Sequence, residues 1–240
     1  MTPAPACRSC GVALRERARF CDACGSSTAV DDAAKYQQVT VLFADVVRSM
    51  DIAAALDLER YREVLTELVD RSTAVVQRFG GGTVEYTGDG VMAVFGAPTA
   101  LEDHARRACL AALAVQQEAG RMAVDVRESD GVDLQLRVGL NSGRVIAGDV
   151  GSRSLHYTAT GEAVGLAQRM ESVAPPGGVM LSQSTARLVD GVAHLGDSEW
   201  VRIKGFAEPV CVYRLLGMHT PRSRASRAEA SMFGRQWEMA

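Results

Sequence analysis

The sequence feature that most constrains the fold is a largely apolar segment at residues 38–46, QVTVLFADV. It lacks the strict alternation of polar and apolar side chains that marks a strand with one face in solvent. A near-continuous apolar run of this length is typical of a strand buried on both faces. Such a strand needs other elements packed on either side, so the chain is expected to build a layered domain around it.

Elements of both kinds follow this strand. Apolar residues at helical spacing predict a helix over 51–79 and a second amphipathic helix over about 102–120. Two short β-rich runs, 83–87 and 91–95, flank a tight Gly-Asp-Gly turn at Asp89. Further strands are predicted at 133–140, 144–150, 154–159, 179–182, 201–204 and 210–216, with helices at 161–173 and 183–189. The order β-α-β-β-α-β with additional C-terminal strands predicts an α+β fold, a ferredoxin-like βαββαβ sandwich in which helices cover an antiparallel-rich sheet.

The rest of the chain divides into short flanking regions. Residues 1–25 contain four cysteines and form a separate small unit, 26–37 are a polar linker, and 38–216 make up the main domain. Residues 217–240 begin as an Arg-, Ser- and Ala-rich linker and end in SMFGRQWEMA, an unusual sequence for a C-terminus. The 240 residues suffice for one full globular domain and one small addition.

Charge and hydropathy limit the partners of the chain. The 26 Lys and Arg against 29 Asp and Glu give a formal net charge of −3, which argues against general affinity for nucleic acid. No apolar run reaches the ~18 residues needed to cross a bilayer. The first ten residues contain no apolar core of a secretory signal. We therefore expect a cytoplasmic protein that does not associate with membranes.

Four of the six cysteines form two pairs, each followed by glycine: Cys7-x-x-Cys10 and Cys21-x-x-Cys24. Two such pairs can supply four thiolates in tetrahedral geometry, which predicts a small zinc ribbon with structural Zn²⁺. A redox pair or two disulfides are the alternatives, but neither explains two matched pairs in a chain without an export signal. The ribbon could contact protein or simply cap the chain, and direct nucleic-acid binding is the weaker option. Cys109 and Cys211 lie in apolar stretches and are expected in the core.

Two aspartates occupy positions where a metal site can form. Asp45 closes the apolar strand, and Asp89 lies in the turn of the predicted hairpin. If hairpin and strand are neighbours in the sheet, the two carboxylates meet at one edge, where they can hold Mg²⁺ against substrate phosphates. Taken singly, Asp45 could instead be a helix cap and Asp89 a turn former.

Five segments in order resemble a known family. VTVLFADVVRSM and GGGTVEYTGDGVMAVFG are similar to the two opening motifs of class III adenylyl and guanylyl cyclase catalytic domains of the bacterial type. LQLRVGLNSGRVIAGDVG, TGEAVGLAQRMESVAPPGGVMLS and WVRIKGFAEPVCVYRLL resemble the later motifs. The resemblance implies conversion of ATP or GTP to a 3′,5′-cyclic nucleotide and pyrophosphate. It also implies a head-to-tail homodimer in which each active site takes residues from both chains.

The same resemblance assigns the metal and phosphate ligands. Asp45 and Asp89 match the carboxylates of a two-metal site for Mg²⁺ or Mn²⁺, with the Val46 carbonyl nearby. The turn after Asp45 would present backbone amides to the phosphates. Arg137 and Lys204 match the cations that hold the triphosphate, although each could be an ordinary charge at a strand edge.

Further residues of the family motifs concern catalysis and the choice of base. Arg169 matches the arginine that stabilises charge on the transferring phosphoryl group; the alternative is a solvated helix residue. Glu85 stands where adenylyl cyclases carry a lysine that reads adenine, and its carboxylate could accept hydrogen bonds from guanine. The second base-reading position is Thr158, so the sequence leaves ATP and GTP both open.

Two departures from the family motifs bear on activity. Gly165 stands where the family has an asparagine that orients the ribose, and glycine offers no side chain for this role. Arg48 and Met50 replace small and hydroxyl residues in the phosphate loop, where Arg48 could add positive charge or obstruct the turn. The sequence thus favours a divergent or weak cyclase in intracellular signalling.

A second function of a different class remains open. The domain could be a catalytically impaired module that binds nucleotide and dimerises as part of a transcriptional regulator. The C-terminal SMFGRQWEMA resembles the start of a signal-transduction ATPase domain. This resemblance implies a larger regulator with ATPase and DNA-binding modules, of which 217–240 would hold a linker and a truncated ATPase start.

Overall fold

The computed structural model describes residues 12–15, 18, 20–23, 35–86, 88–149 and 157–219. For 83–86, 146–149 and 157–160 the description covers the backbone alone. Three of the predicted zinc ligands (Cys7, Cys10 and Cys24), most of the linker 26–37 and the tail 220–240 lie outside the described residues.

The main domain alternates strands and helices in the predicted βαββαβ order and then adds further elements. In chain order these are β1 (Lys35–Val46), α1 (Ser49–Ala55), α2 (Leu58–Arg78), β2 (Thr83–Tyr86), β3 (Gly90–Phe95), α3 (His104–Asp130), β4 (Leu136–Asp149), β5 (Tyr157–Thr160), α4 (Glu162–Val173), β6 (Val179–Ser182), α5 (Gln183–Leu188), β7 (Ala193–Val201) and β8 (Val210–Met218). Within the described ranges the strands form one eight-stranded sheet, in the order β2-β3-β1-β4-β6-β8-β7, with β5 paired to β4. The β4–β6 pairing is parallel and the other pairings are antiparallel. The predicted α+β fold is confirmed.

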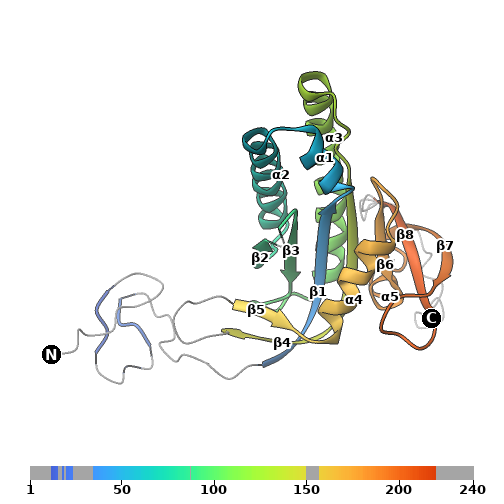
Figure 1. The fold of residues 1–240 in the computed structure, drawn as a ribbon. Coiled ribbons are helices and arrows are strands. Elements are labelled where there is room, and N and C mark those ends of the chain that lie inside the picture. Colours follow the sequence, from blue (N-terminus) through green and yellow to red (C-terminus); the bar gives the residue numbers. More distant parts are fainter. Residues whose placement is uncertain are drawn as a thin grey trace, which may run out of the picture.

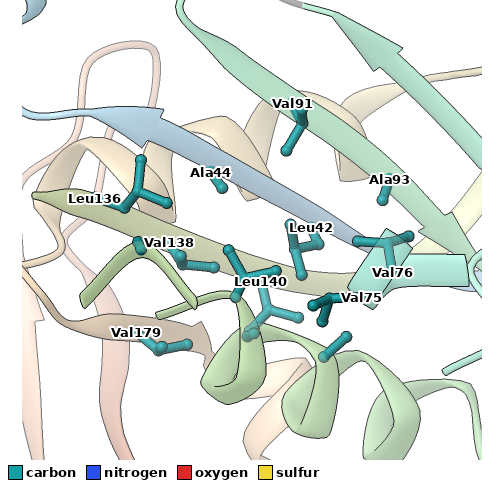
Figure 2. Close-up of a cluster of buried hydrophobic side chains, with 14 of the residues drawn as sticks. Leu42, Ala44, Val75, Val76, Val91, Ala93, Leu136, Val138, Leu140 and Val179 are labelled. Carbon is teal, nitrogen blue, oxygen red and sulfur yellow. The ribbon is translucent and has the colours of Figure 1, made fainter. Parts of the chain in front are cut away.

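Helices cover both faces of this sheet (Figure 1). Alternate side chains of β1 face opposite ways, as the pleat of a strand requires. Leu42 and Ala44 join the core beneath α2 and α3, and Figure 2 shows Leu42 beside Val75 and Val76 of α2. The intervening β1 residues lie on the other face, in a core shared with α4. The apolar run is therefore buried on both faces, as predicted.

Several predicted boundaries differ from the structure. The helix expected over 51–79 is two helices, because the chain turns at Asp57, whose side chain accepts a hydrogen bond of 2.8 Å from the Arg60 amide and caps α2. Helix α3 continues ten residues beyond the predicted end, because Met122 and Val126 keep an apolar face against the core until Gly131 ends the helix at φ 71°.

Two strand predictions also need correction. The strands expected at 133–140 and 144–150 are one continuous strand, β4, which stays paired with β1 along its length. The predicted strand at 201–204 is wrong in position. The strand there is β7, which pairs with β8 and ends at Val201. Cys109 and Cys211 are buried, as expected.

Helix α4 lies unusually close to strand β4. A Cβ atom added at Gly139 of β4 would come within 1.9 Å of the Glu171 amide nitrogen and 2.6 Å of the Ala167 carbonyl oxygen. Those neighbours are backbone atoms and cannot rotate away. Ala167 and Met170, on the same side of α4, are fully buried. The absence of a side chain at Gly139 therefore sets how closely α4 approaches the sheet.

We expect Gly139→Ala to destabilise the domain by about 2 kcal/mol or more, because it forces the helix away from the sheet. For a domain of this size, thermal unfolding should show a fall in Tm of about 4 °C or more. The matched control is Gly165→Ala on α4, where an added Cβ meets no heavy atom within 4 Å. The control should be neutral or gain up to about 1 kcal/mol from helix propensity. Equal Tm values for the two variants would contradict the close packing.

Candidate active site

The candidate site forms at the end of the central strand β1. In the sheet register, Asp45 is opposite Gly90 of β3 on one side and opposite Arg137 of β4 on the other. Asp89 immediately precedes Gly90, so the hairpin turn places the second carboxyl beside the first. Pairing of β1 with β3 ends at Asp45, while pairing with β4 continues to Val46. The sheet thus brings together three of the predicted site residues: Asp45, Asp89 and Arg137.

The two carboxyl groups interact directly. The pKa of Asp45 is raised to about 6, mainly by burial and then by a hydrogen bond with Asp89 and the Asp89 charge. The Arg137 charge and the Val46 backbone N–H act in the opposite direction and favour the ionised form of Asp45. Two carboxyls held in contact repel each other when ionised, and a divalent cation between them would relieve this repulsion. The donor set therefore fits a divalent metal ion.

This pair supplies only part of a metal coordination shell. Among the residues that the structure describes, no group of three or more His, Cys, Asp or Glu side chains is arranged to hold an ion. Mg²⁺ is commonly bound by one or two carboxylates, with substrate phosphates and water completing the shell. The two aspartates have the composition expected of a site that binds metal together with a phosphorylated ligand.

Arg137 lies between the carboxyl pair and helix α4. Its Nη2 is 3.8 Å from Asp45 Oδ2, and its Nε is 3.1 Å from Glu171 Oε1. The pKa of Glu171 is raised to about 7, mainly by burial. The Arg137 charge lowers this pKa, and the charges of Asp45 and Asp89 raise it. The sequence analysis missed Glu171. The available signal was its spacing from Ala167 and Ala174, which puts an acidic side chain on the buried face of the helix.

The turn after Asp45 differs from a simple phosphate loop. The Val47 N–H donates to the Gln135 carbonyl at 2.9 Å, so this amide is already engaged. Arg48 has a left-handed backbone with φ 56°, and its exposed Nε donates to Asp51 Oδ2 at 2.6 Å. Met50 is largely exposed. Arg48 therefore lies at the turn, with its charge paired to a neighbour.

Arg169 contacts the backbone of the other predicted cation, Lys204. The Nε of Arg169 on α4 donates to the Lys204 carbonyl in the loop between β7 and β8, at 3.2 Å. In the described part of the chain, neither Arg169 nor Lys204 is hydrogen-bonded or ion-paired to Asp45 or Asp89. Gly165, one helical turn before Arg169, is exposed. Within the described residues of one copy, no hydrogen bond or ion pair therefore joins Arg169 or Lys204 to the predicted metal ligands.

The two predicted base-reading positions lie on strands that are not paired in the sheet but come close to each other. Glu85 is on β2, in register with Met92, and Thr158 is on β5, in register with Gly148. Strands β2 and β5 contact each other. The side chains of both residues lie outside the description, so their roles in base recognition stay predictions.

The predicted zinc ribbon also stays a prediction. Of its four cysteines the structure describes Cys21, which is buried, and the other three lie outside the described ranges. Separately, none of the helices in the described ranges is both long and apolar enough to span a membrane.

An α+β domain with paired carboxylates at the end of its central strand has a donor set suited to metal and phosphate. Comparison with known proteins gives the family: residues 32–217 match the adenylate and guanylate cyclase catalytic domain. The chain belongs to this family, and it contains a nucleotide cyclase domain.

Relatives and solved structures agree with this assignment. The chain is 29% identical to adenylate cyclase 1 of Rhizobium meliloti over 78% of its own length and 28% of that protein. It is 32% identical to an adenylate cyclase of Mycobacterium tuberculosis over 71% of its length and 38% of the relative. The guanylate cyclase domain of RhGC from Catenaria anguillulae, solved in complex with GTP, has a TM-score of 0.71 and 29% identity, covering 78% of this chain and all of that one. The chain thus spans well under half the length of these two curated relatives.

The burial of Asp45 and its closeness to Asp89 should appear as a pH-dependent stability. Because the folded-state pKa of Asp45, about 6, lies above its ordinary value of 3.8, ionising this group lowers the stability of the folded protein. The loss is absent below about pH 4, where Asp45 is protonated in both the folded and unfolded states, and it is complete above about pH 6. In metal-free buffer, Asp45→Asn should therefore gain stability over the wild type as pH rises from 4.5 to 7.5. Discounted for solvent screening, we expect a gain of about 1 kcal/mol, or about 2–4 °C in Tm.

The control for this measurement is Asp197→Asn, which replaces an exposed carboxylate on β7. Its Tm difference from the wild type should stay constant between the two pH values. A constant difference for Asp45→Asn as well would show that neither burial nor Asp89 disfavours the ionised form of Asp45.

Proposed function

We propose that this domain is a phosphorus-oxygen lyase that converts ATP or GTP into the 3′,5′-cyclic nucleotide and pyrophosphate, at a low rate, for intracellular signalling. The observation that carries the proposal is the contact between Asp45 and Asp89 at the end of β1, with Arg137 beside it. The names of relatives support it, since adenylate and guanylate cyclases occur among them. A cytoplasmic location follows from the nucleoside triphosphate substrate.

The metal-binding part of the mechanism assigns Asp45, Asp89 and the Val46 carbonyl as ligands of two Mg²⁺ or Mn²⁺ ions. When bound, such ions promote attack by the ribose 3′ oxygen on the α-phosphorus and stabilise the departing pyrophosphate. Arg137, next to the carboxyl pair, binds the triphosphate. Its planar guanidinium suits phosphate, to which it can donate two parallel hydrogen bonds.

The remaining cations would come from a second copy of the chain. Arg169 would stabilise negative charge on the transferring phosphoryl group, and Lys204 would bind the triphosphate. The lack of a hydrogen bond or ion pair between these cations and Asp45 or Asp89 within the described residues of one chain supports a head-to-tail homodimer, in which α4 of one copy faces the carboxyl pair of the other. A non-canonical dimeric guanylyl cyclase domain occurs among the structural neighbours, which supports dimerisation as such and not this particular arrangement.

The base preference is proposed to depend on Glu85 and Thr158. A carboxylate at position 85 can accept hydrogen bonds from N1–H and the 2-amino group of guanine, whereas adenine presents no such pair of donors. Thr158 can donate or accept, so it would tolerate either base. This chemistry favours GTP, while the adenylate cyclases among the relatives keep ATP in consideration.

A second candidate function is a regulatory module with little or no catalysis. The open space around Gly165 favours it, because a ribose there would lack a side chain to orient its hydroxyls. In this proposal the domain binds nucleotide, dimerises and passes a signal to ATPase or DNA-binding modules joined through 217–240. The zinc ribbon at 1–25, with Cys7, Cys10, Cys21 and Cys24 around structural Zn²⁺, and the linker 26–37 would then connect the domain, 38–216, to a protein partner.

Purified protein incubated with Mn²⁺ or Mg²⁺ and either ATP or GTP should release cyclic nucleotide and pyrophosphate in equal amounts. Asp45→Asn should lower the rate by at least about 100-fold, because it removes a metal ligand while the fold is retained. Asp197→Asn should match the wild type. Absence of product with both nucleotides, from protein shown to be dimeric, would contradict the enzymatic function and leave the regulatory one.

Gly165→Asn tests whether the missing ribose contact limits the rate. A positioning hydrogen bond commonly contributes orders of magnitude to rate, so the variant should raise kcat by about tenfold or more. Gly165→Ala supplies a Cβ without hydrogen-bonding groups and should leave kcat near the wild-type value. An equal response to both substitutions would indicate an effect of helix stability instead of ribose positioning.

A further inference from the structure

We propose that Glu171 is a positioning residue for Arg137: from helix α4 it holds the guanidinium away from Asp45 and so leaves the carboxyl pair free to bind metal. The proposal rests on the proposed function, in which Arg137 binds the triphosphate. In this proposal Glu171 contacts neither metal nor substrate but determines the position of the Arg137 guanidinium.

The distances show how the arginine is shared. Its Nε is 3.1 Å from Glu171 Oε1, whereas its Nη2 is 3.8 Å from Asp45 Oδ2, beyond hydrogen-bonding distance. The Glu171 side chain is 9% exposed, and those of Arg137 and Asp45 are each 29% exposed. The arginine is therefore held more closely by the buried carboxylate, and it remains accessible at the end that faces the site.

The ion pair leaves hydrogen-bonding capacity unused. Arg137 Nε and Glu171 Oε1 are both buried, yet neither makes a well-aligned hydrogen bond. A guanidinium has five N–H donors, so an arginine anchored near Nε can still direct its terminal nitrogens toward another anion. The geometry suits a cation that is restrained in place while its phosphate-binding end stays free.

Glu171 is a rigid anchor because its backbone cannot shift. Its amide nitrogen lies against Gly139, where even an added methyl group would approach to 1.9 Å. Gly139 is two residues after Arg137 on β4, so the helix and the strand that carry the pair are locked together at this point. The neighbouring Met170 is fully buried.

Charge balance gives this anchor its effect. Asp45, Asp89 and Glu171 place three carboxyls around one arginine. Without the Glu171 charge, the guanidinium has no counter-ion on the α4 side, and the carboxyl pair becomes its strongest attraction. A small movement would bring Nη2 onto Asp45 Oδ2, where the arginine would compete with a cation for that carboxylate.

The test measures Mn²⁺ binding to the full chain in the absence of nucleotide, by electron paramagnetic resonance at pH 8. Glu171→Gln keeps the shape of the side chain and removes its charge. We expect it to weaken Mn²⁺ binding by about tenfold, the effect typical of residues that orient metal ligands. Glu162→Gln, an exposed acid in the first turn of the same helix, should bind Mn²⁺ like the wild type.

The double variant Glu171→Gln/Arg137→Gln separates positioning from a structural role. If a released arginine blocks Asp45, removing it should restore Mn²⁺ binding to the wild-type level or above. If Glu171 only stabilises the fold, the double variant should bind no better than Glu171→Gln. That result, or wild-type Mn²⁺ binding by Glu171→Gln itself, would overturn the proposal.

If the Glu171→Gln protein does not fold, the single variant Arg137→Gln provides the test. Loss of the arginine alone should tighten Mn²⁺ binding several-fold, and unchanged or weaker binding would overturn the proposal. Because the readout is binding of the metal alone, it is independent of turnover. If the wild-type protein binds Mn²⁺ but forms no cyclic nucleotide, the proposed activity is contradicted. The Mn²⁺ affinities of the variants still decide the role of Glu171 in that case.

Discussion

The antiparallel pairing of β1 with both β3 and β4 is the constraint on which the rest of this domain depends. It buries one set of β1 side chains under α2 and α3 and the alternate set under α4. It also fixes the register that puts Asp45 between Gly90 and Arg137. A shift by one residue would exchange the two cores and turn Asp45 away from its partners, so core packing and site geometry are enforced together.

The site that results is held in an electrostatically costly state. The carboxyls of Asp45 and Asp89 lie side by side, and the buried carboxyl of Glu171 lies on the other side of Arg137. Both Asp45 and Glu171 have raised pKa values. Stability alone would not favour such a cluster, because each buried charge loses hydration. The cost is the kind expected of a site whose charge is balanced only when cations and phosphates are bound.

Helix α4 connects this cluster to the other half of the predicted chemistry. Its inner face carries Glu171 and packs on Gly139, while Gly165 and Arg169 lie one turn apart toward the solvent side. In the proposed dimer, the position of α4 on the sheet therefore affects both the arginine of its own site and the residues that would reach the second copy.

Local patterns in the sequence were enough for much of the fold. The apolar run of β1, the Gly-Asp-Gly hairpin and the short β6 and α5 elements were predicted nearly at their observed bounds, since burial and turn chemistry are encoded by neighbouring residues. The meeting of Asp45 and Asp89 followed as soon as hairpin and strand were assumed to pair. The break at Asp57, the added turns of α3 and the unbroken length of β4 were missed, because capping contacts and long-range pairing override periodicity there.

The burial of Glu171 had a signal in the sequence, its helical spacing from Ala167 and Ala174, but its role did not. Nothing in the segment RMESV indicates that an arginine 34 positions earlier will lie against this glutamate. The sequence by itself determined which groups are available: two aspartates, an arginine, a glycine where an asparagine is usual, and four cysteines. Only the tertiary structure decided which of these groups meet, because distances between charges depend on strand register and on how closely α4 approaches Gly139, and both are set by contacts between residues far apart in the chain.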